Sequence, residues 1–269
     1  MEYGLIGEKL KHSFSKEIHE RIGKYEYELV ELSKDEFDSF MTNKNFKAIN
    51  VTIPYKQEVI KYLDYISDEA KKINAVNTIV NKNGKLYGYN TDYLGFKEML
   101  SHFNIDVTDK NVMILGTGGT ANTVSQLVKD LNAKSITFVS RNAKENVITY
   151  ENVKDYSKDI DVLINTTPVE MYPNNEKQIL SSLEGFNNLK GVVDVIYNPL
   201  RTNLTLKAKE AIIASCNGLF MLIAQAFYAI EIFLDIKLNK QIIISLYEEI
   251  LKNKENIVLI GMPGCGKTT

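Results

Sequence analysis

Hydrophobic positions in residues 1–103 switch between the spacing of strands and that of helices. Asn83-Gly84 is a dipeptide typical of two-residue hairpins, so we expect paired strands on its two sides. Pro54 ends another strand, because proline cannot donate to a sheet ladder. Such alternation indicates an α/β domain. The predicted strands are 3–6, 25–29, 48–53, 75–80 and 85–89, and the predicted helices are 15–22, 35–41, 57–65 and 93–103.

A second pattern begins at Asn111, where the apolar runs become continuous. Strands are predicted at 112–115, 136–139, 162–165 and 191–195, with a helix at 121–131 after the first of them. Continuous apolar strands that alternate with helices are typical of a parallel, doubly wound sheet. Two further helices are predicted at 219–234 and 240–252. We therefore expect an N-terminal α/β domain at 1–103, completed by 235–252, and a Rossmann-type domain at 104–234.

The composition excludes several classes of function but does not indicate a particular one. Lys and Arg number 32 against 34 Asp and Glu, a balance that argues against a nucleic-acid partner. Two cysteines and three scattered histidines predict neither a disulfide framework nor a metal site. The first residues lack the basic and apolar regions of a secretory leader, and no apolar run reaches the about 18 residues of a membrane helix. The simplest expected location is the cytoplasm.

A glycine turn follows the strand at 112–115. Gly116-Thr117-Gly118-Gly119-Thr120-Ala121 fits the G-x-G-x-x-A pattern between a strand and a helix. The first glycine allows a tight turn, the second lets the backbone approach a pyrophosphate, and the helix N-terminus faces the anion. The pattern predicts a dinucleotide site, and a glycine-rich turn of purely structural use is the alternative.

The end of the next strand bears on which dinucleotide binds. An NAD site usually has a carboxylate there for the ribose 2′-hydroxyl, but this chain has Ser140-Arg141-Asn142-Ala143-Lys144. A guanidinium binds phosphate through two parallel hydrogen bonds. NADP is therefore favoured over NAD, unless Arg141 is only a solvated loop charge.

Candidate acid–base groups precede the glycine turn. Lys56 follows a strand end and a proline turn, where a side chain can point into a cleft, and Asp92 comes after a later strand. A lysine is a useful base when its pKa is lowered, and a neighbouring carboxylate would orient its ammonium form but oppose that lowering. With a dinucleotide site, this pair predicts hydride transfer to or from a small polar molecule. The alternative is a surface salt bridge.

Further polar residues cluster beside apolar strands. Asn77, Thr78, Asn90 and Thr91 need hydrogen-bond partners there, which could be one another or a polyhydroxylated ligand. The hydroxyls of His12-Ser13-Phe14-Ser15 would point the same way in an extended segment and could hold a ligand carboxylate. Ser15 could equally cap the following helix.

Over about residues 1–250 the chain resembles the shikimate 5-dehydrogenase family. Each matching run is modest alone, and their number and order make the resemblance specific. The runs are His12-Ser13-Phe14-Ser15, Asn50-Val51-Thr52-Ile53-Pro54-Tyr55-Lys56, Ala75-Val76-Asn77-Thr78, Gly88-Tyr89-Asn90-Thr91-Asp92, Gly116-Thr117-Gly118-Gly119, Asn165-Thr166-Thr167-Pro168-Val169, Asp194-Val195-Ile196-Tyr197-Asn198-Pro199-Leu200, and Gly218-Leu219-Phe220-Met221 with Gln225.

The resemblance implies reversible, NADPH-dependent reduction of 3-dehydroshikimate to shikimate in aromatic amino-acid biosynthesis. It implies a substrate domain and an NADP domain with a cleft between them, no metal, and Lys56 and Asp92 as the catalytic pair. Ser13 and Ser15 would hold the substrate carboxylate. Other substrate contacts implied are Thr52, Asn77, Tyr197 and Gln225. Cofactor contacts implied are Gly116, Thr117, Gly118, Gly119, Thr120, Ser140, Arg141, Lys144, Val195, Gly218 and Met221.

Three departures from the family pattern stand out. The cofactor loop often reads Asn-Arg-Thr in the family, and here it is Ser140-Arg141-Asn142, which keeps the arginine and so the expected NADP preference. Lys16 replaces a usual proline at a helix start, where we expect little functional effect, and Glu170 replaces a usual glycine before Met171. A carboxylate near the cofactor cleft could weaken binding of an anionic cofactor. Two alternatives stay open: a relative that accepts quinate or NAD, and a catalytically silent member that binds ligand as a regulatory module. A monomer and a homodimer both fit.

The last seventeen residues carry a different motif. An apolar run leads into Gly261-Met262-Pro263-Gly264-Cys265-Gly266-Lys267-Thr268, the G-x-x-x-x-G-K-T pattern of a phosphate-binding P-loop. This segment resembles the opening of shikimate kinase, so we expect a dehydrogenase–kinase fusion cut inside the kinase, with 253–256 as the linker. Without the rest of a kinase domain, we expect no kinase activity from this chain.

Overall fold

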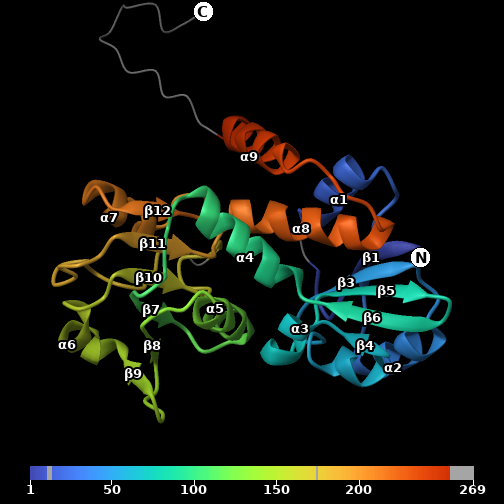
Figure 1. Ribbon diagram of the computed structural model, residues 1–269, viewed down its shortest axis with the longest axis horizontal. Coiled ribbons are helices and arrows are strands. Elements are labelled where there is room, and N and C mark those ends of the chain that lie inside the picture. The colour runs from blue at the N-terminus through green and yellow to red at the C-terminus, as the bar shows by residue number, and fades with distance from the viewer. Residues whose placement is uncertain (11–13, 174, 255–269) are drawn as a thin grey trace, which may run out of the picture.

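The computed structural model describes residues 1–10, 14–173 and 175–254. In this part the chain forms two six-stranded sheets with helices around them (Figure 1). This architecture confirms the expected two-part α/β fold. Ser13 and the P-loop pattern at 261–268 lie outside the described residues. None of the described helices is long and apolar enough to cross a membrane.

The first sheet has the strand order β2-β1-β3-β5-β6-β4. β1 runs parallel to β2 and β3, and β3 pairs antiparallel with β5. The expected hairpin joins β5 to β6, and its two turn residues have the positive φ angles that such turns need, 55° at Asn83 and 83° at Gly84. The strands are β1 (Tyr3–Gly7), β2 (Glu28–Glu31), β3 (Ala48–Val51), β4 (Tyr65–Ile66), β5 (Thr78–Lys82) and β6 (Lys85–Tyr89).

Several predictions for this half were wrong in detail, and the strand expected at 75–80 begins only at Thr78. The helix expected at 57–65 is a short 3₁₀ turn, Glu58–Tyr62, followed by β4. The strand expected at 25–29 begins only at Glu28. Before that point, the rings of Tyr25 and Tyr27 pack around His19, with the His19 and Tyr27 ring centroids 4.1 Å apart, so aromatic packing replaces strand pairing there.

The second sheet is parallel throughout, with the order β12-β11-β10-β7-β8-β9. Counted from β7, this is the 3-2-1-4-5-6 order of a dinucleotide-binding Rossmann fold. Sequence patterns missed β9 and β12, which have only three residues each. The strands are β7 (Asn111–Leu115), β8 (Ser135–Ser140), β9 (Val147–Thr149), β10 (Val162–Asn165), β11 (Gly191–Asp194) and β12 (Ala214–Cys216).

A pair of helices joins the two halves. α4 (Thr91–His102) and α8 (Leu219–Leu234) pack on one another, and α8 also contacts β3 and β5 (Figure 1). Their buried faces share one hydrophobic core with the second sheet, including Phe96, Phe220 and Phe227. The other helices are α1 (Ser15–Gly23), α2 (Lys34–Asn43), α3 (Asp68–Ile73), α5 (Gly119–Asp130), α6 (Val153–Ser157), α7 (Asn203–Glu210) and α9 (Gln241–Lys254), with a 3₁₀ turn at Tyr150–Asn152.

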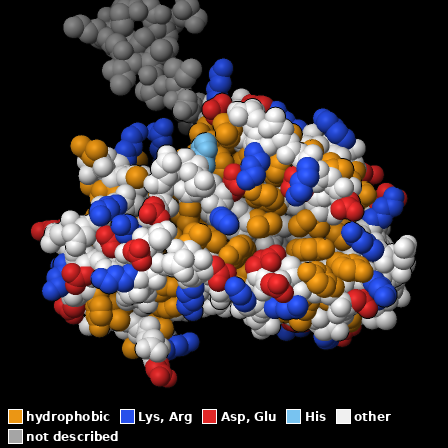
Figure 2. Space-filling model, viewed as in Figure 1, with side chains coloured by type: hydrophobic (Ala, Val, Ile, Leu, Met, Phe, Trp, Pro, Cys, Tyr) orange, Lys and Arg blue, Asp and Glu red, His pale blue; other side chains and the backbone are white. Residues whose placement is uncertain are grey.

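The surface agrees with the near-neutral formal charge of −2. On the face shown in Figure 2, Lys and Arg side chains are interspersed with Asp and Glu side chains, and neither sign gathers into one region. On this face there is no continuous basic surface of the kind that binds a nucleic-acid backbone.

Candidate active site

One pocket of about 510 Å³ is lined by residues from both halves of the fold. The first half contributes the ends of β1 and β3 with the start of α4, and the second contributes α5, the segment after β11, and α8. The pocket brings together most of the residues singled out in the sequence. These are Ser15, Thr52, Lys56, Asn77, Asp92, Thr120, Val195, Tyr197, Gly218, Met221 and Gln225.

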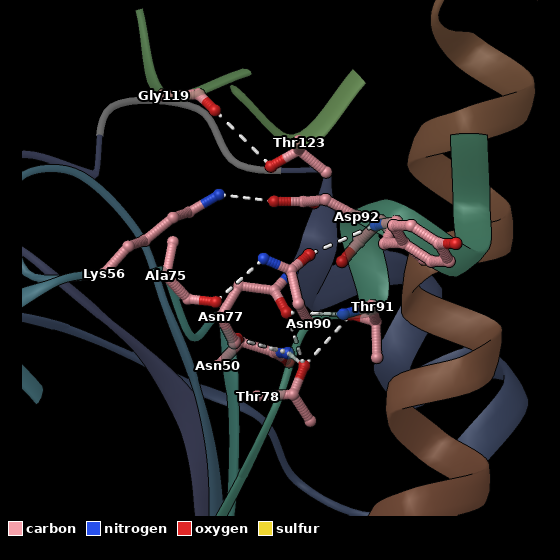
Figure 3. A network of polar contacts seen from close by, with 12 residues as sticks. Asn50, Lys56, Ala75, Asn77, Thr78, Asn90, Thr91, Asp92, Gly119 and Thr123 are labelled. Carbon is pink, nitrogen blue, oxygen red and sulfur yellow. Dashed lines mark hydrogen bonds and ion pairs between the residues drawn. The ribbon is translucent and has the colours of Figure 1, made fainter. Parts of the chain in front are cut away.

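Lys56 and Asp92 meet at the wall of this pocket. The Lys56 Nζ donates to Asp92 Oδ2 over 2.5 Å, and the two side chains point toward one another from different elements (Figure 3). They are 30% and 20% exposed, so the pair is mostly shielded from solvent but open to the pocket. This geometry differs from the surface salt bridge considered above, because a ligand in the pocket would lie against both groups.

The start of α4 fixes where Asp92 lies. Asn90 caps this helix: its Oδ1 accepts from Tyr93 N over 3.1 Å, and its Nδ2 donates to Ala75 O over 2.9 Å. Asp92 follows in the first helical turn, where the helix dipole favours a negative charge. Asn90 is thus a buried cap behind the pocket, 1% exposed, and both its amide oxygen and its amide nitrogen bond within the protein.

Asn77 lies between this cap and the pocket. Its Oδ1 accepts from the Thr91 backbone N–H over 2.7 Å and from the Thr78 hydroxyl over 3.0 Å (Figure 3). Among the described residues its amide nitrogen has no hydrogen-bond partner, while Asn77 lines the pocket. The polar residues of this cluster thus divide between the two expected uses. Thr78, Asn90 and Thr91 bond within the protein, and Asn77 presents a donor to the pocket.

Asn50 is a pocket residue that sequence reasoning missed. Its Oδ1 accepts from the Tyr27 hydroxyl over 2.8 Å, and its Nδ2 donates to Thr78 Oγ1 over 3.0 Å. Burial of Tyr27 raises the pKa of that phenol well above its usual value. A signal was present in the sequence, because Asn50 precedes Thr52 by two positions and extended residues two apart face the same side.

The glycine turn has the geometry that its pattern predicts. Gly116 has a φ of 106°, and a Cβ there would lie 2.7 Å from Thr166 Oγ1. A Cβ on Gly118 or Gly119 would meet no atom within 4 Å, so the backbone is open on that side. α5 begins here without a side-chain cap, which leaves its first N–H groups available to an anion. Thr120, in the first turn, lines the pocket.

The three candidates for the cofactor phosphate lie one strand away. Ser140 ends β8, and its Oγ accepts from Asn142 N over 3.3 Å. Lys144 forms an antiparallel bridge with Val147. Burial raises the pKa of the nearby Tyr150 hydroxyl, and the Arg141 charge opposes that rise. These residues do not line the 510 Å³ pocket, but β8 neighbours β7, so the ends of both strands lie along one edge of the sheet.

Comparison with known proteins shows which family the sequence belongs to. A family model described as the shikimate dehydrogenase substrate binding domain matches residues 5–79. A shikimate dehydrogenase (NADP(+)) from Clostridium beijerinckii is 41% identical over 262 residues, which cover 91% of this chain and 96% of the relative. The chain belongs to the shikimate dehydrogenase family.

Solved structures of the family share the fold. A chorismate mutase/shikimate 5-dehydrogenase fusion protein from Clostridium acetobutylicum has a TM-score of 0.87 and 38% identity, covering 93% of this chain and 97% of that one. A shikimate 5-dehydrogenase from Listeria monocytogenes, solved with shikimate and NAD, has a TM-score of 0.80 and 27% identity, covering 93% and 96%. The expectation of a dehydrogenase is confirmed at the level of the family.

Two features change how the family pattern applies to this chain. Ser15 is the first residue of α1 and lines the pocket, while Phe14 rather than Ser15 is at the N-cap position. Glu170 was expected near the cofactor cleft, but it is 1% exposed and its carboxylate binds backbone N–H groups of the protein. Lys9 and Met171 are among the other residues that line the pocket and were missed by the sequence analysis.

Proposed function

We propose that this family member catalyses the reversible, NADPH-dependent reduction of 3-dehydroshikimate to shikimate. The observation that carries the proposal is the Lys56–Asp92 pair, which shares one pocket with Thr120 of the glycine turn. The pocket thereby joins an acid–base group to the start of a dinucleotide site. We also propose the division into a substrate domain, 1–103 with 235–252, and an NADP domain, 104–234, with α8 packed on both.

The chemistry assigns separate roles to the two catalytic groups. When bound, NADPH would supply the hydride that the carbonyl carbon of the substrate accepts. In its ammonium form, Lys56 donates a proton to the carbonyl oxygen, and in the reverse direction its amine takes the proton of the hydroxyl. Asp92 accepts a hydrogen bond from the Lys56 ammonium and holds this side chain toward the pocket.

The lining of the pocket suits an anionic, polyhydroxylated substrate. Its charged side chains are Lys9, Lys56 and Asp92, and the last two neutralise one another. Among the described residues Lys9 has no carboxylate within ion-pair distance, so the pocket carries one uncompensated positive charge. We propose that Ser13 and Ser15 bind the substrate carboxylate, with the other polar contacts from Thr52, Asn77, Tyr197 and Gln225.

We propose NADP as the cofactor. Its pyrophosphate would lie on Gly116, Thr117, Gly118, Gly119 and Thr120 at the start of α5, and its nicotinamide beside Val195, Gly218 and Met221. Ser140, Arg141 and Lys144 would bind the 2′-phosphate, because this strand end offers a guanidinium and an ammonium where an NAD site offers a carboxylate. The name of the C. beijerinckii relative supports NADP.

Lys56→Ala tests the assignment against that of a silent, ligand-binding relative. The variant removes the proton donor but leaves the carboxylate-binding side of the pocket, so we expect kcat to fall about 10²- to 10⁴-fold while shikimate still binds. The measurements are NADP⁺ reduction by absorbance and shikimate binding by calorimetry. A variant with wild-type kcat would remove Lys56 from the chemistry.

We further propose that the P-loop pattern at 261–268 begins a shikimate kinase unit. Its support is the sequence motif itself, together with the C. acetobutylicum relative, whose dehydrogenase is fused to a different enzyme. Sequencing the gene beyond the codon for Thr269 tests this proposal. A reading frame that continues into a kinase domain supports it, and a stop codon at that point contradicts it.

A further inference from the structure

Glu170 occupies an unusual backbone position. Its φ is 79°, in the left-handed region that favours glycine, and the residue is 1% exposed. A side chain held in this conformation carries a cost in backbone strain. Burying a carboxylate adds a further cost unless hydrogen bonds satisfy it. Contacts made by the carboxylate must therefore offset both costs.

These contacts go to backbone N–H groups of two other segments. Glu170 Oε1 accepts from Ile179 N over 3.0 Å, while Oε2 accepts from Asn203 N and, over 3.4 Å, from Leu204 N. Asn203 and Leu204 open α7, where N–H groups lack partners within the helix and a negative charge is favoured. One carboxylate thus ties the segment after β10 to the following loop and to α7.

The next residue along the chain faces the pocket. Met171 lines it together with Val195, Gly218 and Met221, the residues proposed to contact the nicotinamide. A second tie fixes the other side of Met171, because Tyr172 N donates to Asn198 O over 3.0 Å. Met171 is therefore held between two anchored residues.

We propose that Glu170 is a positioning residue for the cofactor, which acts by holding Met171 against the nicotinamide end of the pocket. The inference rests on the proposed function for its assignment of that end. It also reverses the expectation for this residue: the carboxylate supports binding of the anionic cofactor, because it bonds to backbone N–H groups of the protein instead of facing the pocket.

Glu170→Gln is the direct test. The amide keeps one acceptor but turns an N–H toward a backbone N–H, so the tie is lost with little change in shape. We expect the Kd for NADPH, measured by titration of its fluorescence, to rise about tenfold, within the range expected for losing a hydrogen bond to a buried charge. The KM for shikimate at saturating NADP⁺ should stay within about twofold, because the substrate end is untouched.

A double-mutant cycle with Met171→Ala separates positioning from general loss of stability. If Glu170 acts through Met171, Glu170→Gln should have little further effect on NADPH binding once Met171 is removed. Glu231→Gln is the matched control, since Glu231 is also buried and its Oε1 accepts from a backbone N–H, that of Leu238, over 2.8 Å, outside the pocket lining. That variant should lower Tm and leave the Kd for NADPH unchanged.

Other results of these measurements would contradict the role proposed for Glu170. If Glu170→Gln lowers Tm but leaves the Kd for NADPH unchanged, the residue has only a structural role and the proposal is overturned. Should this variant fail to fold, Glu170→Gly replaces it, because glycine suits the backbone conformation, and the same tenfold change is expected. Wild-type protein that binds NADPH but does not oxidise shikimate would contradict the proposed function, while the binding comparison would still decide the role of Glu170.

Discussion

At the residue scale, the proposed function depends on a charge balance inside the pocket. Lys56 and Asp92 form a pair, which fixes the geometry of the proposed proton donor and balances its charge. Lys9, on the segment after β1, is the cation left over among the described lining residues. An anionic substrate therefore meets a site with a favourable charge, whereas a neutral analogue would gain nothing from Lys9.

Lys9→Ala should raise the KM for shikimate about fivefold with kcat unchanged, since a solvent-accessible ion pair contributes up to about 1 kcal/mol. Steady-state assays with shikimate and with its neutral methyl ester measure this effect. Lys16→Ala is the control, because Lys16 is outside the pocket lining and pairs with Glu20 over 3.2 Å. An equal loss with the ester would show that Lys9 does not act through charge.

His19 makes stability depend on pH. Burial in the aromatic cluster lowers its pKa to about 3, so folding favours the neutral ring. Its contribution is complete above the unfolded pKa of about 6.5 and falls by about 1.4 kcal/mol per pH unit below that. Asp194 acts in the opposite direction, because burial raises its pKa to about 6 and stability gained by protonation appears as the pH falls below that value.

The two effects can be separated by comparing the wild type with His19→Phe. The difference in unfolding free energy between the two proteins, from urea denaturation, should shift against the wild type by about 1.6 kcal/mol in total as the pH falls from 6.5 to 5. The Asp194 contribution is common to both proteins and cancels. A difference that stays constant over this interval would mean that His19 does not titrate on unfolding.

At the element scale, the start of α4 contributes to the stability of the fold and also sets the position of Asp92. The Asn90 cap sets the first turn of the helix, and Asp92 is carried in that turn. The sequence was informative in part, because it predicted a helix at 93–103 and singled out Asn90, Thr91 and Asp92 just before it. It could not assign the partners, since whether Asn90 or Asn77 faces the ligand depends on pairing between β5, β6 and α4.

Asn90→Ala should lower the unfolding free energy by about 1–2 kcal/mol through loss of the cap, and should also reduce kcat because Asp92 moves with the turn. Urea denaturation and steady-state kinetics measure the two effects. Ser33→Ala provides the comparison: Ser33 caps α2 through Glu36 N on an exposed face, so only stability should fall. Unchanged kcat in Asn90→Ala would separate the cap from the site.

At the scale of the whole molecule, most of the fold followed from hydrophobic pattern. Continuous apolar runs predicted the parallel sheet. In the other sheet, Asn83-Gly84 predicted the hairpin between β5 and β6. Short elements such as β9 and β12 could not be predicted, because three residues carry too little periodicity. The inward turn of Glu170 could not be predicted either, since two of its N–H partners, those of Asn203 and Leu204, begin a helix more than thirty positions away along the chain.

Residues from both halves of the fold line the pocket, so enzymatic activity is the most direct test of the proposed function. The measurement is the rate of NADP⁺ reduction by the wild-type protein with shikimate, run beside NAD⁺ and quinate. We predict rapid turnover with NADP⁺ and shikimate and much slower turnover with either replacement. Preference for quinate or NAD⁺ would contradict the assigned substrate or the assigned role of Arg141. Measurable shikimate binding with no turnover would contradict the catalytic role of Lys56 and Asp92.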